Sequence, residues 1–138
     1  MDDTLAGIVR KRAGDCCEYC RLPDARHPGP FEIEHIIPKQ HGGATTQGNL
    51  AYACLHCNRH KGPKFAGIDR FQSSRSLVRL FHPRRHKWHR HFRWDGATLV
   101  GRTPVGRVTI IVLNMNAPLR VAVRQQLIDE KVFPESDR

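Results

Sequence analysis

The sequence lacks the apolar segments that mark membrane and secreted proteins. It contains no run of about 18 apolar residues that could cross a bilayer, and no apolar stretch near the N-terminus of the kind found in secretory signals. The first residues, Met1 to Thr4, carry two acidic side chains, which a signal or transit peptide would not favour. We therefore expect a cytoplasmic protein.

Acidic residues are few. The chain of 138 residues has 13 Asp and Glu against 23 Lys and Arg, which gives a formal net charge of +10. Such a balance predicts a polyanionic partner: nucleic acid is the first expectation, and an anionic membrane surface is the weaker second. The length fits one domain with an appended subdomain, and we see no internal repeat or low-complexity segment.

The five cysteines are an odd number with an ordered spacing. Two Cys-x-x-Cys pairs, Cys17/Cys20 and Cys54/Cys57, enclose 33 residues (21–53). In a reducing compartment this spacing predicts one tetrahedral Zn²⁺ site, with a redox or disulfide pair as the alternative. Cys16 is left over, and it could replace Cys17 as a ligand only if the first pair had three intervening residues.

The first half of the chain alternates short elements with loops. Gly14 would end an N-terminal helix whose apolar face is Leu5, Ile8 and Val9. Pattern and turn residues predict these elements: a helix within 1–15, a loop at 21–30, a strand at 31–37, an extended segment at 49–53 and a helix at 54–61. Gly62-Pro63 would end that second helix, and residues 64–80 read as a linker.

The second half predicts a hairpin followed by helices. Asp95-Gly96 is a two-residue turn signal between an alternating run at 88–94 and residues 97–100. Thr103-Pro104 resembles an N-cap with proline at the first helical position, so we favour a helix there, although the β-branched run at 108–112 also fits a strand.

A last helix is expected at 116–132, with Leu119, Val123 and Leu127 on one face. The aromatic residues of the alternating run, Trp88, Phe92 and Trp94, are expected to form the core face of a strand. The alternative is that nucleic-acid bases stack on them.

The segment between the cysteine pairs holds the groups that phosphodiester hydrolysis needs. His35 is a natural general base, because imidazole titrates near neutral pH. Glu34 and Asn58 offer hard oxygen ligands suited to Mg²⁺ or Mn²⁺. Lys61 or Arg59 could hold a phosphate oxygen.

The order of these residues resembles the HNH endonuclease family. The resemblance rests on Cys17-x-x-Cys20, on Glu34-His35-Ile36-Ile37-Pro38, and on Gly42-Gly43, Asn49-Leu50 and Cys54-x-x-Cys57-Asn58-x-x-Lys61, about a third of the chain. It implies a small α+β fold: a β-hairpin and one helix around a catalytic metal (a ββα-metal core), stapled by a four-cysteine zinc site. Fragments of the C-terminal half, such as Leu80-Phe81-His82-Pro83-Arg84, also resemble a tail found on some bacterial HNH proteins, for which we know no role.

The resemblance also implies roles for single residues. His35 would be the general base, and Glu34 and Asn58 would be ligands of the catalytic metal. Asn49 would hold the hairpin loop and orient the base. His60 and His56 are rivals of Asn58 for the last ligand position.

The orientation of Glu34 and His35 does not follow simply from the sequence pattern. Neighbouring residues of a strand point to opposite faces, so Glu34 and His35 would face one metal only if the strand ends, bulges or twists there.

Arg84 and Arg85 begin a basic stretch that we expect to contact phosphates. A metal site is one reading of its histidines at 82, 86, 89 and 91, but their irregular spacing and the many arginines favour a solvated, phosphate-facing surface.

These inferences combine into one reading and its rivals. We expect an HNH core at 1–63, a linker at 64–80 and a basic hairpin-and-helix extension packed on the core at 81–138. The expected activity is metal-dependent hydrolysis of DNA, mainly through contacts with the duplex backbone; RNA stays open as a substrate, and the oligomeric state is not indicated. The rivals are a zinc-containing nucleic-acid-binding module without catalysis and, more weakly, a thiol redox protein.

Overall fold

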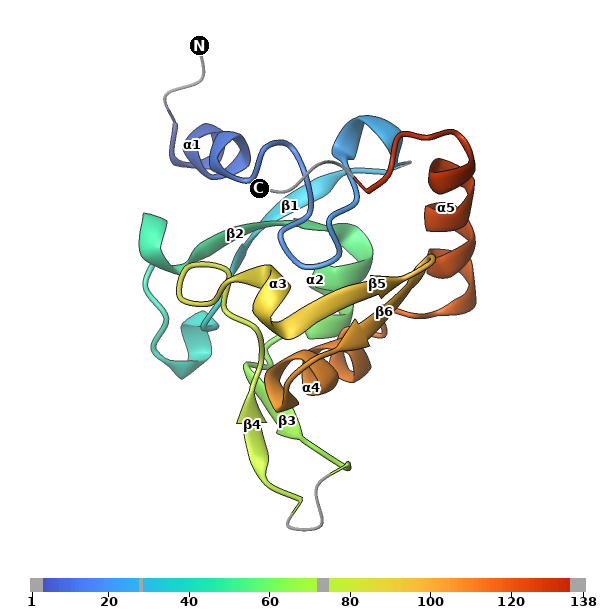
Figure 1. Ribbon diagram of the computed structural model, residues 1–138. Coiled ribbons are helices and arrows are strands. Elements are labelled where there is room, and N and C mark those ends of the chain that lie inside the picture. The colour runs from blue at the N-terminus through green and yellow to red at the C-terminus, as the bar shows by residue number, and fades with distance from the viewer. Residues whose placement is uncertain (1–3, 28, 72–74, 135–138) are drawn as a thin grey trace.

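A computed structural model describes residues 4–27, 29–71 and 75–134, so the acidic first residues and part of the expected linker lie outside the described residues. The structure mixes helices with three two-stranded antiparallel sheets, which confirms the expected α+β class (Figure 1). No helix in the described ranges is long and apolar enough to cross a membrane.

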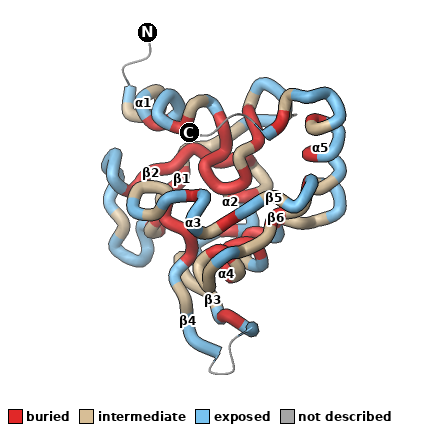
Figure 2. The backbone as a smooth tube through the Cα atoms, viewed as in Figure 1, coloured by how far each residue is buried: buried red, intermediate tan, exposed pale blue. Residues whose placement is uncertain are grey.

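The central unit is a hairpin followed directly by a helix. Strand β1 (Phe31–His35) pairs with β2 (Leu50–Cys54), with Phe31 opposite Cys54 and His35 opposite Leu50. Every residue of β2 is buried, because helix and loop segments cover it on both faces (Figure 2). Helix α2 (Leu55–Lys61) begins at the next residue, so the strand and helix share one rigid corner.

The loop that joins β1 to β2 is closed by one side chain. Asn49 accepts a hydrogen bond from the backbone N–H of Ile37 at 2.9 Å, and its amide donates to the carbonyls of Ile37 at 3.0 Å and Ala44 at 2.9 Å. Gly43 must lack a side chain, since a Cβ there would lie 1.7 Å from the Ile37 carbonyl oxygen. These contacts fix the position at which β1 ends.

Helix α1 (Leu5–Arg12) covers β2 from one side. Its Val9, together with Ala13 just after the helix, packs on Leu50 and Tyr52 in a small cluster of its own. Thr4 caps the helix by accepting from the Gly7 N–H at 3.1 Å. The expected apolar face is only partly right, because Ile8 is 36% exposed. In the segment that follows α1, a 3-10 helix spans Asp24–Arg26.

The stretch expected to be a linker contains a hairpin. Strands β3 (Ala66–Ile68) and β4 (Leu77–Arg79) pair antiparallel, with Gly67 opposite Val78. A Cβ on Gly67 would lie 2.8 Å from the side chain of Val108, so glycine allows the hairpin to pack closely on a later helix. The glycine that suggested a flexible connection therefore has a packing role.

The expected second hairpin is present, with a shorter first strand. Residues Trp88–His91 form a helical turn, α3, and β5 (Phe92–Asp95) pairs with β6 (Thr98–Gly101). Trp88 and Phe92 are buried with ring centroids 5.0 Å apart, and Trp94 packs beside them. These aromatic rings belong to the core and are not a free stacking surface.

Two helices complete the chain. Helix α4 (Pro104–Val112) is the favoured helix rather than the alternative strand, and Thr103 caps it by accepting from Gly106 N–H at 3.1 Å. Helix α5 (Pro118–Asp129) begins at the expected proline.

The expected apolar face of α5 is only partly right. Leu119 is 80% exposed, whereas Arg124 is fully buried. The Arg124 guanidinium donates to the carbonyls of Ala97 at 2.7 Å and Met115 at 2.8 Å, which explains how a charged side chain can lie inside.

One apolar core joins the two halves of the sequence. The same cluster contains the four paired cysteines, Trp88 and Phe92 from the second hairpin, and Leu127 of α5. The elements from 81 onward thus share a core with the first half. The division at 63 and 80 into separate units remains a prediction.

Candidate metal centre and active site

Four buried cysteines converge on one point. The Sγ atoms of Cys17, Cys20, Cys54 and Cys57 all lie within 4.8 Å of one another, and those of Cys20 and Cys54 are 3.8 Å apart. A tetrahedron of thiolates around Zn²⁺, with Zn–S bonds of about 2.3 Å, has S–S edges of about 3.8 Å. The four cysteines are positioned to bind a metal ion, and their geometry fits zinc.

Local structure presents each pair of sulfurs. The first pair lies in the turn after α1, and the second lies where β2 becomes α2. In both pairs a backbone N–H points at the first sulfur: Cys20 N to Cys17 Sγ and Cys57 N to Cys54 Sγ, each at 3.4 Å. Such bonds favour the thiolate form that a metal requires. Cys16 is buried outside this group, so Cys17 is the fourth member.

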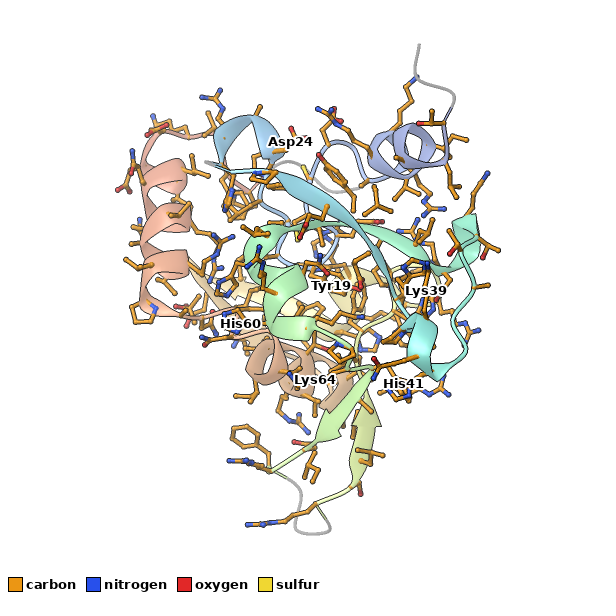
Figure 3. All side chains as sticks on the ribbon, turned by 180° about the vertical axis from the view of Figure 1, so that it is seen from behind. Tyr19, Asp24, Lys39, His41, His60 and Lys64 are labelled. Carbon is orange, nitrogen blue, oxygen red and sulfur yellow. The ribbon has the colours of Figure 1, made fainter. Side chains whose placement is uncertain are left out.

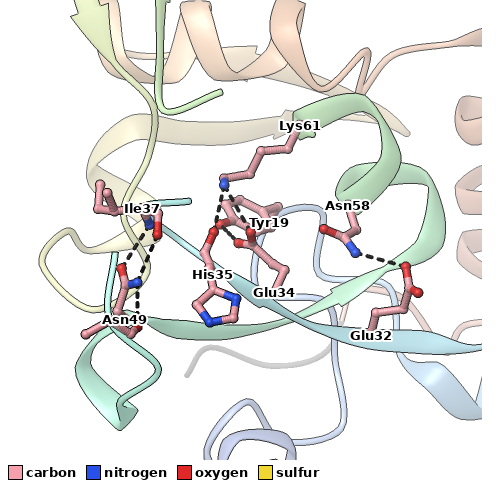
Figure 4. A network of polar contacts seen from close by, with 9 residues as sticks. Tyr19, Glu32, Glu34, His35, Ile37, Asn49, Asn58 and Lys61 are labelled. Atoms are coloured by element: carbon pink, nitrogen blue, oxygen red, sulfur yellow. Dashed lines mark hydrogen bonds and ion pairs between the residues drawn. The ribbon is translucent and has the colours of Figure 1, made fainter. Parts of the chain in front are cut away.

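The acid and the histidine at the end of β1 do face opposite sides. Glu34 points inward and is only 5% exposed, whereas His35 points outward (Figure 4). The Tyr19 hydroxyl donates to one oxygen of Glu34, and the Lys61 ammonium lies 3.0 Å from the other. Both carboxylate oxygens therefore have partners within the protein.

Lys61 links the acid to the backbone of the histidine. Besides its ion pair with Glu34, its ammonium donates to the carbonyl of His35 at 3.1 Å, and the residue is 1% exposed. Burial raises the pKa of Glu34, and Lys61 and the Tyr19 hydroxyl oppose that rise. Tyr19 lies between the cysteines of the first pair, inside the molecule (Figure 3), so this network ties the end of β1 to the metal centre.

His35 has the environment of a neutral imidazole. Its Nε2 is 2.8 Å from the Thr45 hydroxyl oxygen, in the loop after β1. Partial burial lowers the pKa of His35, and the positive charges of Lys39 and Lys61 lower it further. The ring is therefore unprotonated, and able to accept a proton, at neutral pH.

Asn58 lies beside these groups on α2. Its amide donates to the Glu32 carboxylate at 2.9 Å, and its Oδ1 has no partner among the described residues (Figure 4). Asn58, Glu34 and His35 line one open hollow of about 320 Å³ with Lys39 and Gly62. The structure thus brings together three of the predicted site residues, while Asn49 holds the loop next to them.

The family comparison matches this same segment. A family model described as HNH endonuclease matches residues 17–64, which run from the first cysteine pair to just past α2. Residues 17–64 form an HNH domain. No curated protein and no solved structure matches the chain. The resemblance drawn from the sequence is therefore confirmed over the segment that carried it.

The rival ligands lie away from the hollow of the HNH domain. His60 is exposed on α2, and His56 bonds to the carbonyl of Asn114 at 2.9 Å. The histidines at 82, 86, 89 and 91 do not form a metal group either: across the described ranges, the four cysteines are the one such group of His, Cys, Asp or Glu.

The basic residues predicted to contact phosphate divide into two kinds. Arg59 and Arg85 are exposed, whereas Lys61 and Arg84 turn inward. The Arg84 guanidinium forms an ion pair with Glu18, between the first two paired cysteines, and its burial lowers its pKa to about 10. Both inward side chains stabilise the HNH domain from within.

Three residues in contact with the site were not singled out from the sequence. Tyr19 and Thr45 bond to Glu34 and His35, and Glu32 bonds to Asn58. Glu32 had a usable signal, since it is two residues before Glu34 and shares its strand face. The hydrogen bonds of Tyr19 and Thr45 depend on how their loops fold, and the spacing of residues in the sequence does not indicate them.

Proposed function

We propose that this protein is a metal-dependent HNH endonuclease that hydrolyses DNA phosphodiester bonds. The observation that carries the proposal is the shared hollow: His35, Glu34 and Asn58 all line it, within the segment that matches the HNH family. The net charge of +10 supports a polyanionic substrate.

Two metals fit the side chains. Zn²⁺ would be held by the four cysteines in a closed, structural site. Glu34 and Asn58, which both line the hollow, have side-chain oxygens of the hard type that Mg²⁺ or Mn²⁺ prefers, and a cation there would share Glu34 with Lys61 and Tyr19. When bound there, the cation would neutralise phosphate charge and support the leaving oxygen.

His35 would remove the proton from the attacking water. The Thr45 hydroxyl, by accepting from Nε2–H, would hold the ring in the tautomer whose Nδ1 carries the lone pair. The ring stays unprotonated at neutral pH because partial burial and two lysines lower the pKa of His35.

Lys61 and Tyr19 would orient the catalytic groups rather than touch the substrate. Lys61 fixes the Glu34 carboxylate and the His35 carbonyl from the inside, and Tyr19 holds the other oxygen of Glu34. Arg59, which is exposed on α2, is then the better candidate to contact phosphate near the hollow.

A plasmid-nicking assay tests the proposal. The protein should nick supercoiled plasmid only when Mg²⁺ or Mn²⁺ is added. His35→Ala should abolish nicking while DNA binding is retained. His60→Ala, which removes an exposed imidazole from the same domain, should leave nicking unchanged. Nicking by the His35→Ala protein at the wild-type rate would overturn the role of His35.

One observation favours the rival, a nucleic-acid-binding module without catalysis. The Glu34 carboxylate already has a buried ammonium and a phenol as partners, which reduces its need for a metal. A wild-type protein that binds plasmid but never nicks it with any divalent cation would establish the rival. Elemental analysis should find about one tightly bound zinc per chain in either case.

A further inference from the structure

A second basic site lies outside the hollow of the HNH domain. Residues 85–91, around α3, and residues 102–103, after β6, surround an open depression of about 680 Å³. We call this depression the basic hollow. Four exposed cations line it: Arg85, Lys87, Arg90 and Arg102.

The cations of the basic hollow have no acidic counterpart. No carboxylate lines it, and within the described ranges none of the four cations forms an ion pair. Elsewhere three inward-facing cations do form ion pairs: Lys61 with Glu34, Arg84 with Glu18 and Arg107 with Asp69. Four unpaired cations around one concavity create a positive potential that attracts anions.

The walls of the basic hollow are fixed by the core. Trp88 anchors α3, because its indole N–H donates to the Tyr19 carbonyl at 2.8 Å. The opposite wall is tied to α3 by the Arg102 N–H, which donates to the His91 carbonyl at 2.8 Å, and by a 2.6 Å contact between His91 and the Thr103 hydroxyl. The cations are thus presented by a preformed surface.

Two residues of the basic hollow also lie near the end of β1. A narrow cavity next to it is lined by Arg85 and His86 on one side and by Ile36, Ile37 and Lys61 on the other. Ile36 directly follows His35, and the loop before α3 lies beside the end of β1 (Figure 1). This cavity, of about 50 Å³, is too small to admit a nucleic-acid strand, so a strand bound at the hollow of the HNH domain would reach the basic hollow over the protein surface.

We propose that the basic hollow is a second phosphate-binding site, which holds the nucleic-acid backbone away from the scissile phosphate. This rests on the proposed function, because the nuclease site supplies the strand. Phosphate groups of DNA match four exposed cations in a concave surface, and the bound strand would release counterions as it docks.

The test compares two pairs of substitutions with equal loss of charge. Arg90→Gln/Arg102→Gln removes two cations of the basic hollow, and Arg26→Gln/Arg93→Gln removes two exposed arginines outside it. Each pair is placed in the His35→Ala protein, and duplex DNA binding is measured over a range of salt without added divalent cation. Each lost phosphate contact lowers the slope of log K against log salt by about 0.9.

We expect the basic-hollow pair to reduce that slope by about 2, and the control pair to leave it unchanged. Arg90→Lys/Arg102→Lys should keep the wild-type slope, which shows that charge matters and that the fold is intact. Equal slopes for the two Gln pairs would overturn the second site. The second site would also be overturned if the Arg90→Gln/Arg102→Gln protein loses binding to phosphatidylserine vesicles while its slope of log K against log salt for DNA is unchanged.

The outcome is separate from that of the endonuclease proposal. The binding experiment uses a protein that cannot cleave and no catalytic cation. If wild-type protein binds DNA without nicking it, the endonuclease proposal is overturned. The comparison of the two Gln pairs still tests whether the basic hollow binds phosphate.

Discussion

Glu34 and His35 are adjacent in the sequence but lie in different environments. The strand sends the carboxylate inward to Tyr19 and Lys61, and it leaves the imidazole at the surface beside Thr45. The alternation expected of a strand therefore holds up to its last residue, although both residues line one hollow with Asn58.

A substitution at Lys39 should move the pH dependence of cleavage. The positive charge of Lys39 helps to lower the pKa of His35, after the larger effect of burial. Lys39→Gln removes that charge, so the pKa of His35 rises and a larger fraction of the base is protonated at a given acidic pH. The acidic limb of kcat/KM for nicking should shift to higher pH, with activity still present above it.

Lys64→Gln is the matched control, since Lys64 is exposed and does not perturb the pKa of His35. An acidic limb that stays in place in the Lys39→Gln protein, or that moves equally in both, would contradict this account of His35.

At the scale of elements, short helices and hairpins are positioned by glycine contacts. Gly106, in the first turn of α4, packs on the carbonyl of His91 at the end of α3, and a Cβ there would lie 1.9 Å from that oxygen. Gly67 allows β3 to approach the same helix closely. The wall of the basic hollow that α3 forms thus depends on the close approach that Gly106 allows, a contact that its place in an expected helix does not indicate.

Gly106→Ala should destabilise the protein by about 1–3 kcal/mol, because the new methyl group forces α3 and α4 apart. Gly48→Ala is the comparison, since a Cβ at Gly48 meets nothing within 4 Å and should change stability by no more than about 0.5 kcal/mol. Chemical denaturation midpoints measure both. Equal midpoints for the two variants would show that the α3–α4 contact is not stabilising.

At the scale of the whole molecule, the cysteine centre connects parts that are far apart in sequence. The four cysteines belong to the main core. The Arg120 guanidinium of α5 donates to Cys54 Sγ at 3.4 Å, and Trp88 reaches the backbone of Tyr19 beside Cys20. Metal binding should therefore support the hairpin and helices of the second half as well as the HNH domain.

Removing zinc should unfold the protein. A structural Zn²⁺ site contributes about 10–16 kcal/mol of apparent binding free energy, which is comparable to the whole stability of a domain, about 5–15 kcal/mol. Chelation should abolish the cooperative thermal transition and shift the fluorescence of buried Trp88. Zinc, but not Mg²⁺, should restore both. A chelated protein that keeps the same transition would show that the cysteines are not a structural metal site.

Much of the local structure could be predicted because its causes are local. The cysteine spacing, the strand ending before Pro38, and the Thr103-Pro104 cap are set by residues within a few positions of one another. The pairing of β3 with β4 and the exposure of Leu119 could not be predicted in this way, because packing against distant elements decides them.

The sequence by itself determined the family segment, the metal-binding cysteines and the set of candidate catalytic groups. The tertiary structure alone decided which charges are available. It buried Lys61 against Glu34, Arg84 against Glu18 and Arg124 among carbonyls, and among the described residues it left the cations of the basic hollow without a carboxylate partner. Long charged side chains find partners across the fold, and the cost of burying an unpaired charge enforces those partners only once the core has formed.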